Sequence, residues 1–355
     1  MLEESGDQLA SRAVGVQETI PGNTEQSSVL APFAESHGIR LELNDNLDSL
    51  ADLLLKAASH EGKGITFLDE PSSELFVTYA ELLNRARRIA KGLQIAGLSP
   101  GEHVLFQCKS NFNFISGFWA CILGGFIPAP IGAAPTYTEK NAALNKLYNS
   151  WELLGHPAIL SDEANVLHLQ ALEEFMDFTA IRVFAIEVLE QSEFATELPV
   201  KGLESFALSL LTSGSTGIPK CVQHRNKSLL ALVQSVSAFF ELSSREVWLN
   251  WMPLDHVGGI VFSHLTSVYL GCKQVIAATE TFMSDPLQWL ELIDKYQASM
   301  SWAPNFAFAL VAAEAENVKQ KKAGIFPLCG TLLMQQKVLC LRQPMHFYIC
   351  LPHSV

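Results

Sequence analysis

Acidic residues are missing from the last part of the sequence. All 37 Asp and Glu residues lie at or before Glu316, whereas five Lys or Arg residues follow it. Such an asymmetry is typical of a basic functional tail, but residues 323–355 form neither a solvated charge run nor a clean helical or alternating pattern. We therefore treat them as an aberrant tail, and our hypothesis is that translation has left the ancestral reading frame there, through a frameshift or an error of gene prediction.

Further absences limit the function. The seven cysteines show no CxxC or Cys/His spacing, so no metal site is predicted. No signal peptide is recognised, and we expect reduced thiols in a cytoplasmic protein. The net charge of −13 argues against a nucleic-acid-binding surface. Residues 115–135 carry no charge, but glycines and prolines interrupt them, so we expect a buried α/β layer and no membrane span.

Predicted helices and strands alternate through most of the remaining chain. The polar residues 1–43 are predicted to form a mostly disordered lead. Residues 44–322 are predicted to form an α/β domain, with subdomains at about 44–200 and 201–322. Alternation of this kind is typical of parallel sheets covered by helices on both faces. Thr78 followed by Glu81 is a capping box, which predicts that a helix begins there.

A loop rich in glycine and hydroxyl groups lies between a predicted buried strand, residues 206–211, and a predicted helix, residues 227–240. Residues 212–220 read Thr-Ser-Gly-Ser-Thr-Gly-Ile-Pro-Lys. Glycines let backbone N–H groups close around an anion, hydroxyls add donors for phosphate oxygens, and the lysine adds positive charge. We therefore predict a phosphate-binding loop. Its candidate residues are Thr212, Ser213, Gly214, Ser215, Thr216, Gly217 and Lys220.

Three other interpretations of this loop fit less well. A flexible Ser/Gly linker rarely joins a buried strand to an amphipathic helix, and Pro219 stiffens the exit. A Walker A loop ends in Gly-Lys-Ser/Thr, whereas here Lys220 follows proline and precedes Cys221. A nucleophile elbow needs a glycine two residues before its serine, but Ser213 stands two residues before Ser215.

The loop closely resembles the signature phosphate loop of the adenylate-forming enzymes, which include acyl- and aryl-CoA synthetases, fatty acyl-AMP ligases, luciferases and the adenylation domains of nonribosomal peptide synthetases. The family pattern Thr-Ser-Gly-Ser/Thr-Thr-Gly-x-Pro-Lys-x-Val-x-His is matched from Thr212 to His224, and the resemblance covers about residues 47–320. It implies the N-terminal part of the adenylate-forming fold, with stacked, mostly parallel sheets flanked by helices. We expect the small C-terminal lid domain to be absent.

A second candidate site follows the predicted strand at residues 247–254. The stretch Asp-His-Val-Gly-Gly at residues 255–259 lies at the carboxyl end of that strand, where open α/β sheets bind ligands. His256 could donate a hydrogen bond to a carboxylate. Taken alone, the stretch is better explained as a helix N-terminus that Asp255 caps. The resemblance favours the ligand site, because the stretch is similar to a family block whose histidine or aromatic residue lies beside the acyl substrate.

The resemblance also bears on the substrate class. In amino-acid-activating members an aspartate near this block pairs with the substrate ammonium, which needs a charged partner when it is buried. If His256 aligns with the histidine of the aryl-acid activators, Val257 takes the position of that aspartate. This favours an aryl, phenylpropanoid or fatty acid over an α-amino acid, unless a register shift of two residues gives the role to Asp255. Trp302 could line the same pocket or belong to the core. The implied substrate-binding residues are His256, Val257, Gly258, Trp302 and Pro304.

Within the family, the sequence looks most like the loading adenylation modules of cyanobacterial hybrid peptide–polyketide synthetases of the microcystin type. The resemblance implies that ATP and Mg²⁺ are used and that a small carboxylic acid is activated as an acyl-adenylate. A carrier-protein or CoA thiol would then receive the acyl group, as in secondary-metabolite biosynthesis.

Several later family blocks are missing from these 355 residues. There is no Tyr-Gly-Pro-Thr-Glu-like segment for adenine and magnesium, no Gly-Asp segment for the ribose hydroxyls, no hinge and no domain with the catalytic lysine. Lys337 lies in no matching context. We therefore assign no catalytic residue and expect little or no adenylation activity from the isolated chain. The alternative function is that of a catalytically dead relic or of a module that binds nucleotide or acid.

Overall fold

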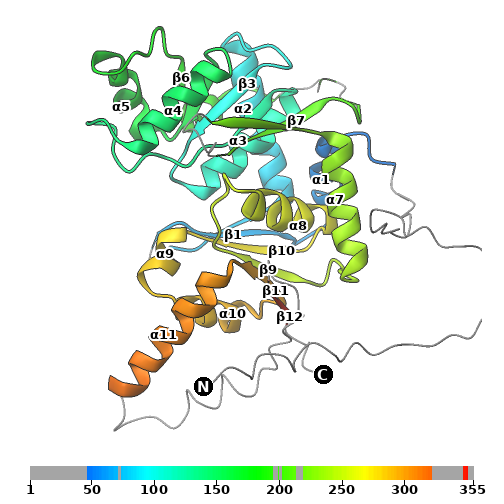
Figure 1. Ribbon diagram of the computed structural model, residues 1–355. Coiled ribbons are helices and arrows are strands. Elements are labelled where there is room, and N and C mark those ends of the chain that lie inside the picture. Colours follow the sequence, from blue (N-terminus) through cyan, green and yellow to red (C-terminus); the bar gives the residue numbers. More distant parts are fainter. Residues whose placement is uncertain are drawn as a thin grey trace, which may run out of the picture. The chain divides into compact units, whose positions relative to one another are not determined.

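The computed structural model describes residues 46–70, 73–194, 199, 202–212, 219–321 and 347–350. All of these residues belong to one compact unit (Figure 1). The predicted disordered lead, residues 1–43, lies outside the described residues, and so does the predicted tail apart from one strand. Of the predicted phosphate loop, residues 213–218 are likewise outside them.

One layer is a six-stranded sheet with the strand order β12-β11-β9-β10-β1-β2. The four inner strands are parallel, and the two edge strands β2 and β12 pair antiparallel with their neighbours. The strands are β1 (Gly64–Leu68), β2 (Leu75–Thr78), β9 (Val247–Asn250), β10 (Lys273–Ala277), β11 (Met300–Ala303) and β12 (Phe347–Cys350). The sequence predicted no element where β12 lies. The subdomain boundary near residue 200 stays a prediction, and strands from both sides of it share this sheet.

A second, four-stranded sheet is entirely parallel and has the order β4-β3-β5-β6. Its strands are β3 (His103–Gln107), β4 (Ile127–Ala129), β5 (Ala158–Ser161) and β6 (Val183–Ala185). Beside β4 lies an antiparallel hairpin of β7 (Phe206–Thr212) and β8 (Lys220–Arg225). The predicted α/β class with mostly parallel sheets flanked by helices is confirmed.

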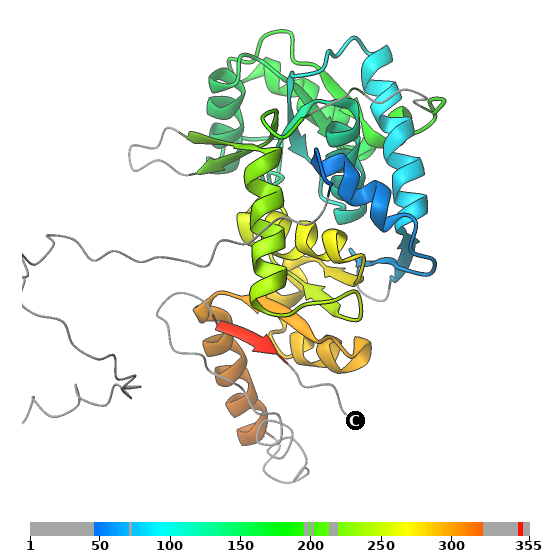
Figure 2. The same ribbon diagram turned by 90° about the vertical axis from the view of Figure 1, so that its right-hand side faces the viewer.

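Helices pack between and outside the two sheets (Figures 1 and 2). Helices α1, α2, α3, α7 and α8 contact one another, and their buried residues share one apolar core with β1 and β3. Within the described residues, no helix is long and apolar enough to cross a membrane. The helices are α1 (Leu50–Ala57), α2 (Tyr79–Ile95), α3 (Asn111–Gly124), α4 (Ala142–Leu153), η1 (Glu163–Asn165), α5 (Val166–Gln170), η2 (Ala171–Glu174), α6 (Ile186–Leu189), α7 (Asn226–Phe239), η3 (Gly258–Leu265), α8 (Thr266–Leu270), α9 (Thr279–Ser284), α10 (Gln288–Tyr296) and α11 (Asn305–Lys321).

The predicted helix start at Thr78 is confirmed. The Thr78 hydroxyl accepts a hydrogen bond from the Glu81 backbone N–H at 3.1 Å, and the Glu81 carboxylate accepts one from the Thr78 N–H at 2.8 Å. The two contacts satisfy donors that the first turn of a helix would otherwise leave open. A local sequence signal is therefore enough to place the beginning of α2.

The prediction of a strand, a loop and then a helix around the glycine-rich stretch is wrong in one respect. Residues Lys220–Arg225 form β8, which pairs with β7 and reverses the chain before α7 begins at Asn226. The loop therefore caps a hairpin and does not open a helix. Its two flanking residues, Thr212 and Lys220, are cross-strand partners.

A buried chain of hydrogen bonds crosses the core between the sheets. The Trp119 indole donates to Nε2 of His264 at 2.8 Å, so Nδ1 carries the proton and donates to Oε1 of Gln274 at 2.9 Å. The Gln274 amide donates to the Tyr79 hydroxyl, which in turn donates to the carbonyl of Cys272, each at 2.7 Å. Because His264 is fully buried, desolvation lowers its pKa to about 4, and the hydrogen bond from His264 to Gln274 opposes this only in part.

Candidate functional site

The predicted substrate residues meet at the carboxyl edge of the six-stranded sheet. Strands β9 and β11 are parallel neighbours. The β9 loop, residues 251–257, follows β9 and leads into η3; Asn250 closes its first turn, because its amide donates to the Met252 carbonyl and accepts from the Met252 N–H. His256 and Gly258 thus lie beyond the end of β9, while Trp302 and Pro304 lie at the end of β11. Their role in binding substrate stays a prediction.

The glycine pair of this stretch allows a close approach that no other residue permits. A Cβ atom on Gly258 would lie 2.7 Å from the Trp302 ring and 2.6 Å from the Met252 methyl. A Cβ on Gly259 would lie 2.2 Å from the carbonyl oxygen of Pro253. Trp302 is buried, and its ring centroid lies 4.9 Å from that of Phe262. Trp302 therefore packs directly against the backbone of Gly258.

The hydrogen bond at His256 defines which ring nitrogen can act on a ligand. Nδ1 of this exposed histidine accepts from the Gly258 N–H at 3.2 Å. In the neutral imidazole the proton therefore lies on Nε2, which is left as a donor. That donor suits a carboxylate oxygen. Val257, which is half-buried, offers no polar atom beyond its backbone.

Asp255 does not cap the helix that follows it, so that alternative is wrong. Its Oδ2 accepts a hydrogen bond from the backbone N–H of Gly132 at 2.9 Å, and η3 has no side-chain cap at its N-terminus. Gly132 belongs to the β4 loop, residues 130–137, which leaves the four-stranded sheet. The carboxylate therefore bridges loops that follow strands of two different sheets.

The hairpin that carries the predicted phosphate loop runs beside β4, whose loop holds Gly132. Phe126, just before β4, lies beside Phe206 and Ala207 at the start of β7. Further along, Leu211 packs in one apolar cluster with Ala129 and Ile131. The carboxyl ends of β4 and β7 therefore lie side by side. Gly132 follows β4 at this end, and Thr212 is the last residue of β7. Thr212 and Lys220 are exposed, and the five residues Ser213, Gly214, Ser215, Thr216 and Gly217 lie outside the described residues.

Sequence reasoning missed Gln107, the last residue of β3. Its side chain is fully buried, and its amide donates to the Gly132 carbonyl at 3.3 Å and to the Phe106 carbonyl at 2.8 Å. Its amide oxygen accepts from the Ala134 N–H and the Tyr137 hydroxyl, each at 3.1 Å. A polar residue that closes an apolar strand, Val-Leu-Phe-Gln at residues 104–107, was the available signal, because a buried amide requires partners.

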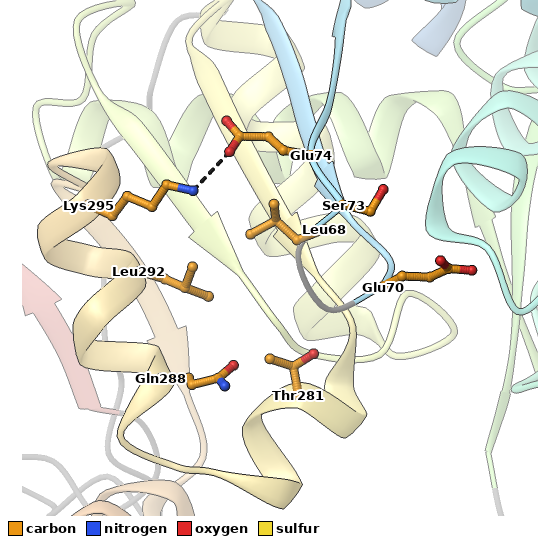
Figure 3. A pocket seen from close by; sticks show the side chains of 8 residues that line it. All are labelled: Leu68, Glu70, Ser73, Glu74, Thr281, Gln288, Leu292 and Lys295. Atoms are coloured by element: carbon orange, nitrogen blue, oxygen red, sulfur yellow. Dashed lines mark hydrogen bonds and ion pairs between the residues drawn. The ribbon is translucent and has the colours of Figure 1, made fainter.

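The described residues contain no group of three His, Cys, Asp or Glu side chains that could hold a metal ion. A cavity of about 170 Å³ lies elsewhere, between β1 and helices α9 and α10 (Figure 3). At its edge Lys295 donates to Glu74 at 2.8 Å. None of the predicted site residues lines it. The lining residues are Leu68, Glu70, Ser73, Glu74, Thr281, Gln288, Leu292 and Lys295.

Comparisons with known proteins place the chain among adenylation domains. The sequence profile of the family described as AMP-binding enzyme matches residues 56–338. A solved structure of McyG A-PCP complexed with phenylalanyl-adenylate is 39% identical, with a TM-score of 0.76, over 79% of this chain and 44% of that chain. An adenylation domain of a keto acid-selecting nonribosomal peptide synthetase module bound to keto acyl adenylate is 41% identical, with a TM-score of 0.73, over 77% of this chain and 50% of that chain.

A curated relative gives the same family. The nonribosomal peptide synthetase acyN of Ascocoryne sarcoides is 30% identical over 68% of this chain and 26% of its own length. The chain therefore spans about a quarter of the length of this relative and half or less of the two solved structures.

Proposed function

The chain belongs to the family of AMP-binding enzymes, and we propose that, as part of an intact adenylation domain, it would activate a carboxylic acid without an α-amino group. The acid is aryl, phenylpropanoid or fatty. A carboxylate oxygen attacks the α-phosphorus of ATP, pyrophosphate leaves, and the acyl-adenylate then passes its acyl group to a carrier-protein or CoA thiol. The transition state gathers negative charge, so the site contributes mainly position and positive potential.

The observation that carries this proposal is the arrangement around His256. Its Nε2–H is the donor left open by the Gly258 contact, and it suits one carboxylate oxygen of the acid. Beside it, Val257 cannot pair with an ammonium, and Asp255 uses a carboxylate oxygen on the Gly132 N–H. An α-ammonium would lose its water and would find as charged partner only a carboxylate that is already bound to the β4 loop.

The solved relatives leave the acid class to experiment. One is bound to a keto acyl adenylate and the other is complexed with phenylalanyl-adenylate, so related sites hold acyl groups with and without an α-ammonium. The residues around His256 in this chain support an acyl group that has no α-ammonium.

Calorimetric titration with 3-phenylpropanoate and L-phenylalanine tests the acid class, because the two share a skeleton and differ in the α-amino group. We expect 3-phenylpropanoate to bind at least about tenfold more tightly, since an unpaired buried ammonium costs more than ~1.4 kcal/mol. Octanoate and benzoate complete the panel and report on the shape of the pocket. Tighter binding of L-phenylalanine would contradict the proposed class.

ATP–pyrophosphate exchange with the same acids separates the two functional classes. We expect the isolated chain to show little or no turnover, because its sequence contains none of the later ATP-binding blocks. Acid-dependent exchange at the rate of an intact adenylation domain would overturn that expectation. Acid binding without exchange is thus the expected result for the isolated chain, and acid-dependent exchange would exclude the second candidate, a module that only binds nucleotide or acid.

Lys220→Ala is expected to weaken triphosphate binding about tenfold or more, because charge-assisted hydrogen bonds to phosphate contribute about 1.5–3 kcal/mol. Lys220 lies opposite Thr212 at the end of the hairpin where the predicted phosphate loop joins the two strands. Fluorescence titration with a labelled ATP measures the effect. The matched control is Lys227→Ala, which removes an exposed lysine of α7 whose contact is with Glu204 at 3.5 Å; equal losses in both variants would contradict a specific role for Lys220.

A further inference from the structure

The contact between Asp255 and Gly132 joins segments that are far apart in the sequence. Asp255 lies in the β9 loop, directly before His256, and Gly132 lies in the β4 loop of the other sheet. The contact is close: a Cβ on Gly132 would lie 3.2 Å from Oδ2 of Asp255. It is therefore a close approach between a carboxylate oxygen and the backbone N–H of an exposed glycine.

The β4 loop is a firm support for this contact. The Gln107 side chain makes three hydrogen bonds to this loop, with the Gly132 carbonyl, the Ala134 N–H and the Tyr137 hydroxyl. Burial raises the pKa of Tyr137, so its hydroxyl stays protonated and donates to Gln107. Gln107 and Ala134 are each 1% exposed or less, so water does not compete for the bonds to Ala134 and Tyr137. Gly132 itself is exposed.

The backbone of His256 is held locally, because its N–H donates to the Pro253 carbonyl and its carbonyl accepts from the Gly259 and Ile260 N–H groups. Its side chain has little support. The side chain of His256 is exposed, and its one described hydrogen bond is to Gly258 in the same stretch. The η3 helix that follows begins at Gly258 without a side-chain cap. An anchor at the residue before His256 therefore has a direct effect on where the imidazole lies.

We propose that Asp255 is a positioning residue, whose carboxylate fastens the β9 loop to the β4 loop held by Gln107 and so holds His256 beside the hairpin that carries the phosphate loop. This inference rests on the proposed function for its effect on acid binding, while the contact itself is independent of that function. Asp255 acts through His256 and the backbone, and it does not touch the acid.

The other role open to Asp255 is that of partner to a substrate ammonium, and the two roles respond differently to asparagine. Asp255→Asn keeps an acceptor oxygen for the Gly132 N–H but removes the negative charge. A fastening residue therefore tolerates asparagine and loses function with alanine. If Asp255 instead paired with a substrate ammonium, both Asp255→Asn and Asp255→Ala would weaken binding, and only the binding of an amino acid.

Hydrogen–deuterium exchange of the full chain tests the fastening without any ligand. In Asp255→Ala we expect faster exchange in peptides covering residues 130–137 and 251–258, and in Asp255→Asn we expect exchange as in the wild type. Asp255→Ser, whose hydroxyl stops short of Gly132, is the second loss-of-contact variant. The control is Asp177→Ala, which removes an exposed carboxylate in another loop. Unchanged exchange in both peptides of Asp255→Ala and Asp255→Ser would overturn the proposal.

Titration with 3-phenylpropanoate then tests the consequence for the site. We expect binding to weaken about fivefold to tenfold in Asp255→Ala, the effect of losing one hydrogen bond that holds the binding residue. Asp255→Asn should restore wild-type affinity. Loss of affinity in Asp255→Asn equal to that in Asp255→Ala would overturn the positioning role. If the wild-type chain binds none of the acids, the proposed function fails, and the exchange experiment still decides whether Asp255 fastens the loops.

Discussion

Alanine at Gly259 is expected to abolish the binding of 3-phenylpropanoate. The new Cβ would lie 2.2 Å from the carbonyl oxygen of Pro253 and 2.9 Å from that of Met252. Both are backbone atoms, so no rotamer change relieves the overlap, and the β9 loop itself must move. We expect a loss of about 3 kcal/mol or more in the free energy of unfolding or in binding, measured by urea unfolding and calorimetry on the same sample.

Two glycine variants make the comparison specific. Gly202→Ala should leave both measurements unchanged, because a Cβ on Gly202 would meet no atom within 4 Å. Gly258→Ala should be intermediate: the Met252 methyl can swing away, whereas the Trp302 ring at 2.7 Å has to shift. Wild-type binding and stability in Gly259→Ala would show that the β9 loop does not pack as described.

Lowering the pH from 6.5 to 4 is expected to cost the protein about 3 kcal/mol of unfolding free energy through His264 alone. Burial lowers the pKa of this histidine to about 4 in the folded protein, whereas in the unfolded chain it titrates near 6.5. The unfolded state therefore binds the proton first as the pH falls. The stabilisation is complete above pH 6.5 and is lost progressively as the pH falls toward 4.

The acid sensitivity has a structural cause that a single variant can isolate. A second proton on His264 would bring Nε2–H against the indole N–H of Trp119. In His264→Gln the amide can accept from Trp119 and donate to Gln274, but it cannot titrate. Urea unfolding at several pH values should show a smaller slope between pH 4 and 6.5 in this variant. Equal slopes in the two proteins would mean that His264 is not the group responsible.

Local sequence signals predicted those parts of the fold that depend on neighbours in the chain. The capping box of Thr78 and Glu81 placed the start of α2, because both hydrogen bonds join residues three positions apart. The alternation of helices and strands gave the parallel sheets. The predicted substrate residues lie at one edge because β9 and β11 are neighbours. That placement was predicted from the family resemblance and not from any local pattern.

Long-range contacts account for what the sequence did not predict. The residues of β8 lack a clean alternation, and β8 is a strand because its backbone groups pair with β7. The partner of Asp255 is more than a hundred residues away, so a helix cap was the simpler prediction. Gln107 likewise acquires its role only when β3 brings it beneath the β4 loop.

The position of β1 in the six-stranded sheet has a consequence for the order in which the chain folds during synthesis. Its pairing partner β10 lies about 200 residues later, which at roughly 5–20 residues per second is a delay of about 10–40 s. All strands of the four-stranded sheet are made within that interval. That sheet can therefore assemble first, while β1 has β2 on one edge and its other edge waits for β10. A nascent chain paused before Lys273 would leave the backbone N–H and C=O groups of that edge without their strand partner.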